Sequence, residues 1–192
     1  MIRVLIMFII MCIVVPELSA QRYIPGQRGL QFTAGAVNGL NFNATSRDFA
    51  YYAGIAMSAY NKRTDRYVVG LEYLEKRYIY KGWTVPQSQI TVDAGYYLKF
   101  YSDWRKMFFL SIGTSAMGGY ESVNWNNKLL PDGATINNKD TFLYGGVLTF
   151  ELETYLSDRF VFLVTVRERL LIGSSLGKFN TQTGFGIKFI IN

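Results

Sequence analysis

Apolar and polar residues alternate with a period of two along most of the chain after Gln21. In residues 89–101 the even positions are apolar from Ile90 to Phe100, whereas the odd positions carry Asp93 and other polar or small side chains. This alternation is typical of an amphipathic β-strand. No segment after Gln21 has a convincing helical period, so the sequence predicts an all-β protein.

The alternation predicts eight strands, most of them longer than the five or six residues usual in soluble sheets. They span residues 30–38, 49–60, 65–80, 87–101, 105–118, 141–156, 159–173 and 178–191. Most reach the roughly 9–11 residues that a tilted membrane strand needs. Short and longer links alternate between the strands, as they do in outer-membrane proteins. We therefore predict an eight-stranded antiparallel up-and-down β-barrel of the outer-membrane type.

The N-terminus has the pattern of a secretory signal peptide. Arg3 precedes an apolar run, Pro16 ends that run, and Leu18-Ser19-Ala20 offers a small-residue cleavage site. We predict a signal peptide over residues 1–20 and a single barrel domain over residues 21–192. An exported chain with an even number of strands has both termini on the periplasmic side of the outer membrane.

The polar face of the predicted strands carries balanced charge. Four acids and four bases fall on this face if it points inward. They form a candidate lumen charge network: Glu72, Asp93, Lys99, Glu151, Glu153, Arg167, Arg169 and Lys188. Because buried charges need partners, and because an eight-stranded barrel has room only for side chains, this set predicts a plugged lumen.

Aromatic residues near the strand ends predict two interfacial girdles. The candidates are Tyr51, Tyr60, Tyr67, Tyr78, Trp83, Trp104, Phe108, Tyr120, Tyr155 and Phe160.

One charge conflicts with the alternation of polar and apolar residues, because Glu168 falls on the outward face between two inward arginines. A bulge or a strand end at Glu168 is therefore expected.

Composition excludes the common catalytic chemistries. The 192 residues have a net charge of +6 and include one cysteine and no histidine, so nucleophilic triads and zinc sites built on Cys and His are ruled out. Glu151 and Glu153 share a face, which suits acid–base chemistry, but they are also placed to pair with Arg167 and Arg169. We predict no enzyme activity, no cofactor, no metal and no small-molecule substrate. The basic residues are scattered, so no direct contact with nucleic acid is expected.

The longest link, residues 119–140, is the most informative loop. It contains the candidate contact residues Trp125, Lys128, Leu129 and Leu130. Apolar residues in a long external loop mark a contact site, or they pack back over the barrel mouth. The sequence leaves both interpretations open.

Several short segments carry a resemblance to a known family. They are Gln21-Arg22 with Pro25 and Gly29-Leu30, then 119–124, 132–134, 144–146, 148–151 and, most distinctively, 154–160. In this combination the chain resembles the TraO family of Bacteroidetes conjugative transposons. The resemblance covers essentially the whole chain after residue 20. It implies a part in conjugative DNA transfer and no catalytic residues.

The sequence thus predicts an outer-membrane component of a mating apparatus with a structural or docking role. Its expected partners are outer-membrane lipid and other proteins of the conjugation apparatus. The alternative is a generic outer-membrane barrel for adhesion, small-ligand binding or passive transport.

Overall fold

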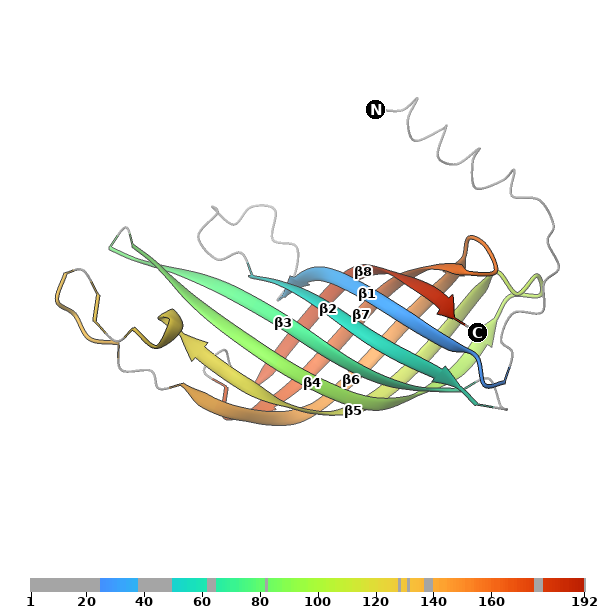
Figure 1. The fold of residues 1–192 in the computed structure, drawn as a ribbon, viewed down its shortest axis with the longest axis horizontal. Helices are drawn as coiled ribbons and strands as arrows, with labels where there is room; N and C mark the ends of the chain where they lie inside the picture. Colours follow the sequence, from blue (N-terminus) through green and yellow to red (C-terminus); the bar gives the residue numbers. More distant parts are fainter. Residues whose placement is uncertain are drawn as a thin grey trace, which may run out of the picture.

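The computed structural model is a closed barrel of eight antiparallel strands (Figure 1). It describes residues 25–37, 50–61, 65–81, 83–127, 129–130, 132–136, 140–174 and 178–191. The strands are β1 (Arg28–Val37), β2 (Ala50–Tyr60), β3 (Arg66–Tyr80), β4 (Trp83–Ser102), β5 (Phe108–Val123), β6 (Thr141–Tyr155), β7 (Phe160–Ile172) and β8 (Phe179–Ile191), with a short 3-10 turn η1 (Asn124–Asn126). The predicted signal peptide lies outside the described residues. Among the described residues, no helix is long and apolar enough to cross a membrane.

Each strand pairs with its neighbour in sequence, and β8 pairs with β1 to close the sheet. Closure gives the strands partners on both sides over most of their length, so it removes the open edges of a flat sheet. The strands are 10 to 20 residues long. The predicted fold class is therefore confirmed.

The largest differences from the predicted strand bounds lie around β4 and β5. β4 begins at Trp83 rather than at residue 87, because Trp83 pairs with Tyr80 at the tip of the β3–β4 hairpin. β5 continues to Val123, which pairs with Gln87 of the lengthened β4. The expected loop over residues 81–86 is thus replaced by a two-residue connection at the end of a long hairpin.

The interior of the barrel holds polar and charged side chains together with apolar clusters, and the outer wall is apolar. Buried side chains include Glu72, Glu153, Arg169 and Lys188, whereas outward residues such as Val92 are about half exposed. This distribution inverts that of a water-soluble protein and suits a wall in contact with lipid.

The prediction is wrong for two of the expected girdle residues, Tyr60 and Tyr155. They are 4% and 1% exposed and pack inside the barrel with Phe109, because they lie on the inward face of their strands.

The expected bulge at Glu168 is also wrong. Pairing runs without a shift through Leu148, Glu168 and Thr181 on three adjacent strands. Glu168 points outward, and its carboxylate accepts a hydrogen bond of 2.6 Å from the Thr181 hydroxyl. The register shift lies instead on β4, between Lys99 and Tyr101.

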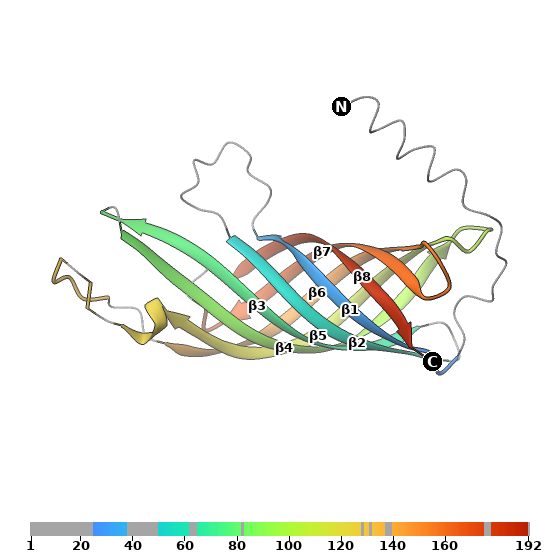
Figure 2. The same cartoon turned by 45° about the horizontal axis from the view of Figure 1, so that its top comes forward.

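The two ends of the barrel differ. At one end, the turn end, lie the short β2–β3, β4–β5 and β6–β7 connections together with the last residue of β8, Ile191. At the other, the loop end, the β3–β4 hairpin extends past its neighbours beside the segment that carries η1 (Figures 1 and 2). The pairing accounts for this extension, because Ala50 at the start of β2 lies opposite Lys76, so that residues 77–80 pair with β4 alone among the described strands.

Inward glycines allow large side chains to cross the lumen. A Cβ atom on Gly184 would lie 2.2 Å from the hydroxyl oxygen of Tyr52 and 2.5 Å from the carbonyl oxygen of Ala34. A Cβ atom on the outward Gly146 would meet nothing closer than 3.7 Å.

We expect Gly184→Ala to lower the free energy of unfolding by about 1–3 kcal/mol, because the added methyl overpacks the lumen against backbone. Urea unfolding in detergent micelles, followed by tryptophan fluorescence, measures the change. Gly146→Ala is the matched control and should stay within about 0.5 kcal/mol of the parent. Equal midpoints for the two variants would contradict the close packing at Gly184.

Candidate functional site

The first group of charges inside the barrel lies toward the turn end and is called here the turn-end cluster. Arg66 contacts two carboxylates, with Nη2 2.5 Å from Oε1 of Glu151 and Nη1 2.9 Å from Oε1 of Glu153. Lys188 also pairs with Glu153 and lies 3.6 Å from Oε1 of Glu151. Tyr60 donates to Glu153 and accepts from Lys188. All five side chains are buried, so two acids and two bases neutralise each other away from solvent.

A second group, the loop-end cluster, lies nearer the opposite end. Arg167 Nη1 is 2.5 Å from Oε2 of Glu72, and its Nη2 is 3.3 Å from Oδ2 of Asp93. Arg169 Nη1 lies 3.2 Å from Oε1 of Glu72, which also accepts a 2.7 Å hydrogen bond from Gln182. This cluster again balances two acids with two bases.

A third polar contact extends the interior toward the mouth. Gln89 Nε2 donates to Oε2 of Glu121 over 2.7 Å, and the hydroxyl of Ser174 donates to the same oxygen over 2.8 Å. Gln89 and Glu121 are each 0% exposed. Buried polar side chains therefore extend from the turn end up to the mouth.

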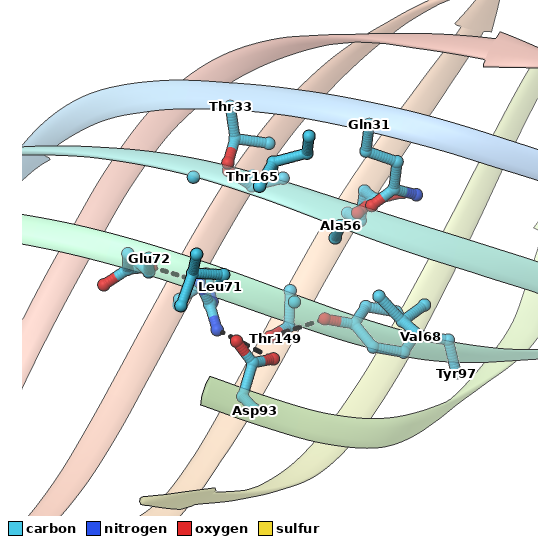
Figure 3. Close-up of a pocket in the computed structure, with 15 residues that line it drawn as sticks. Gln31, Thr33, Ala56, Val68, Leu71, Glu72, Asp93, Tyr97, Thr149 and Thr165 are labelled. Atoms are coloured by element: carbon cyan, nitrogen blue, oxygen red, sulfur yellow. Dashed lines mark hydrogen bonds and ion pairs between the residues drawn. The ribbon is translucent and has the colours of Figure 1, made fainter. Parts of the chain in front are cut away.

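A small cavity of about 30 Å³ lies in the middle of the barrel (Figure 3). Its lining includes Gln31, Glu72, Asp93 and Tyr97, and the Tyr97 hydroxyl bonds to Thr149 across the lumen. Such a space holds about two water molecules. The described interior is therefore filled by side chains, with no room for a macromolecule.

The structure brings together seven of the eight residues of the candidate lumen network. Glu151, Glu153 and Lys188 are in the turn-end cluster; Glu72, Asp93, Arg167 and Arg169 are in the loop-end cluster. The eighth, Lys99, is only half-buried, and its Nζ lies 5.6 Å from the ring centroid of Phe109.

Two sets of interior residues are missing from the sequence prediction. In the sequence Arg66 follows Lys62 and Arg63 and looks like one more cation of the same turn, but its even number places it on the same face of β3 as Glu72. That parity was the available signal. Gln89 and Glu121 were missed because residues 119–140 were read as loop, whereas Glu121 belongs to β5 and pairs with Gln89.

At the loop end, one hairpin and one loop form a single structure, called here the protrusion (residues 77–87 and 121–136, as far as described). Leu130 is buried against Val85 and Val123, with Ala134 and Ile136 packed beside them. Lys81 at the hairpin tip lies 3.2 Å from Oδ2 of Asp132. The backbone N–H of Ala134 and the Lys81 ammonium lower the pKa of Asp132, and Asp132 in turn raises the pKa of Lys81. The loop is thus held against the hairpin by apolar contact and by charge.

The candidate contact residues of this loop separate into two groups. Leu130 packs back onto the hairpin, whereas Trp125 and Leu129 are 63% and 72% exposed. Asn124, Trp125 and Asn126 all have positive φ, from 50° to 66°. Asparagine tolerates this region but tryptophan rarely adopts it, so local strain accompanies the exposed indole. Lys128 lies outside the described residues.

The arrangement offers little for catalysis. Glu151 and Glu153 are held by Arg66 and Lys188 rather than by Arg167 and Arg169 as the sequence suggested. Over the part of the chain that the structure describes, no group of three or more His, Cys, Asp or Glu residues is placed to hold a metal ion. The geometry is that of a structural ion-pair network.

Comparison with known families gives one match. The family described as "Conjugative transposon protein TraO" matches residues 24–191, nearly the whole chain. Comparison with curated proteins gives no match.

Solved structures with the same fold are outer-membrane β-barrels. Neisserial surface protein A is similar with a TM-score of 0.58 at 10% identity, over 84% of this chain and 96% of that one. The attachment invasion locus protein of Yersinia pestis, solved with the heparin analogue sucrose octasulfate, is similar with a TM-score of 0.54 at 9% identity, over 87% and 99%. At these identities the similarity establishes the fold alone.

We expect Arg66→Met to destabilise the barrel by about 3–5 kcal/mol, because it leaves Glu151 and Glu153 buried with Lys188 as their remaining cation in the cluster. Urea unfolding in micelles measures the loss. Lys81→Met is the matched control, since it removes an exposed cation from an ion pair, and it should leave the midpoint unchanged. A similar small change in the free energy of unfolding for both variants would show that the ion pairs of the turn-end cluster do not stabilise the barrel.

We also expect no steady single-channel current from the purified protein in a planar lipid bilayer, because the described lumen is filled by paired charges. The measurement compares the parent with a known porin under the same salt and voltage. Stable conductance steps would contradict a plugged lumen.

Proposed function

This chain belongs to the TraO family of conjugative transposon proteins, and we propose that it is an outer-membrane β-barrel component of a conjugative mating apparatus with a structural, docking role. The observation that carries this proposal is the combination of a lumen filled with paired charges and an apolar outer wall. A barrel of this kind is suited to anchor an assembly in the membrane rather than to conduct DNA.

The orientation follows from the two unlike ends. We place the turn end and both termini in the periplasm, where a chain exported by the predicted signal peptide over residues 1–20 arrives. Short connections are typical of the periplasmic side of such barrels and longer loops of the outside. The protrusion then faces the cell exterior.

The wall residues support insertion into lipid. Ile55, Leu71, Val92, Phe150 and Ile187 point outward and are each at least 40% exposed. Burying such apolar area contributes roughly 25 cal/mol for each Å² removed from water. Outer-membrane lipid is thus one partner. Other proteins of the mating apparatus are the second, at the periplasmic turns and at the protrusion.

A role without catalysis is part of the proposal. The paired carboxylates Glu151 and Glu153 are bound to cations inside a closed lumen, where a substrate has no access. The polar groups of the interior thus stabilise the barrel.

We expect a donor with a clean in-frame deletion of this gene to transfer its element at least a hundredfold less often, because the anchored assembly loses its outer-membrane component. Mating frequency measures the effect. Restoring the gene in trans should recover transfer.

The control is donor growth and envelope integrity, which should not change with the deletion. Restoration with Gly146→Ala should work as well as the parent gene. Unchanged transfer in the deletion strain would contradict the proposed role and would favour a generic barrel for adhesion, ligand binding or passive transport.

A further inference from the structure

The protrusion contains a stretch of sheet edge that has no partner among the described strands after the barrel closes, called here the open edge. β2 begins at Ala50 opposite Lys76, so residues 77–80 of β3 pair with β4 and with no other described strand. Tyr80 and Trp83 close a two-residue connection, and alternate residues of an antiparallel strand bond to opposite neighbours. The N–H and C=O groups of Arg77 and Ile79 therefore point toward the open edge.

An open edge is a template for a further strand. Native sheets blunt such edges with proline or charge, yet Tyr78, Ile79 and Tyr80 occupy this one and are 36%, 48% and 40% exposed. These apolar and aromatic residues favour β-structure. The charged residues Arg77 and Lys81 lie at the two ends of this apolar stretch.

The inner side of the same hairpin forms one wall of an open groove of about 500 Å³. Tyr78, Tyr80 and Val85 line it from the hairpin, and Leu130 and Ile136 line it from the folded-back loop. A strand added to the edge would direct every second side chain toward this groove. Apolar side chains suit that face.

The outer side of the edge carries exposed positive charge. Arg77 pairs with Glu75 at 2.7 Å but keeps 58% of its side chain exposed, and Lys81 keeps 66%. Lys76 adds a third cation on the inner side of the edge, where its Nζ lies 4.8 Å from the ring centroid of Tyr78. The carboxylates beside the edge are those of Glu75 and Asp132. The described edge thus carries three cations against two carboxylates, and the exposed Arg77 makes its outer face suitable for acidic side chains.

We propose that the open edge of β3 binds an extended segment of a partner protein by β-strand addition. The segment alternates apolar residues, which face the groove, with acidic residues, which face Arg77. Backbone hydrogen bonds to Arg77 and Ile79 supply affinity, and the groove supplies side-chain selectivity. The inference rests on the proposed function only in placing this partner outside the cell.

The test uses the full-length protein in detergent micelles and a fluorescent eight-residue peptide that alternates valine with glutamate. Fluorescence anisotropy should detect saturable binding. A peptide with proline at two central positions, or with lysine in place of glutamate, should bind at least tenfold more weakly. Equal binding of the proline peptide would overturn strand addition, as would no binding of the valine–glutamate peptide.

Ile79→Pro removes the edge N–H without removing a hydrogen bond to β4, and it should weaken peptide binding at least tenfold. Ile79→Ala is the matched control because it keeps the N–H, and it should bind within about threefold of the parent. Heat-modifiable migration on gels checks that both variants form the barrel. Unchanged binding by a folded Ile79→Pro protein would overturn the proposal.

A second variant keeps the test decisive if Ile79→Pro does not fold. Arg77→Glu should reverse the preference, so that the lysine peptide binds more tightly than the glutamate peptide. An unreversed preference would overturn the assigned chemistry. Because these assays use purified protein, their failure is distinct from a failure of the mating experiment.

Discussion

Backbone hydrogen bonding in an apolar surrounding is the constraint on which the rest of this structure depends. A strand in lipid finds no water for its N–H and C=O groups, so the sheet must close on itself. Closure by the β1–β8 pairing then directs alternate side chains inward and outward. The apolar set takes the outer wall, and the polar set is enclosed in a lumen just wide enough to hold it.

Enclosure makes the ion pairs a consequence of the fold. Glu72 faces two arginines from β7, and Arg66 faces two carboxylates from β6. Each charge has lost its water, so its partners must come from across the barrel. Glycines such as Gly184 leave the space through which Tyr52 reaches Thr165 at 3.4 Å. Charge pairing and close packing together give a lumen occupied by side chains.

Much of this architecture could be predicted from the sequence because period-two alternation fixes the face of every strand residue. That rule placed Glu151, Arg169 and Lys188 inside the barrel. The same rule did not predict how far each strand extends, because alternation assigns the face of a residue and not the end of a strand. The extension of β4 to Trp83 depends on pairing with Tyr80, and the course of β5 to Val123 depends on pairing with Gln87. Those contacts join two strands, so no single segment contains their signal. The pairing of Arg66 with β6 was hidden for the same reason.

The unequal length of the strands gives the barrel a bevelled rim. β3, β4 and β5 form its high side, while the end of β1 and the start of β2 form its low side. A barrel whose strands all end at the same height looks alike from every side, but this barrel is asymmetric about its axis. A partner protein that binds the high side above the bilayer must therefore approach the barrel from that side. In an ordered assembly, the rotation of the barrel about the membrane normal is therefore as much a part of its placement as its depth.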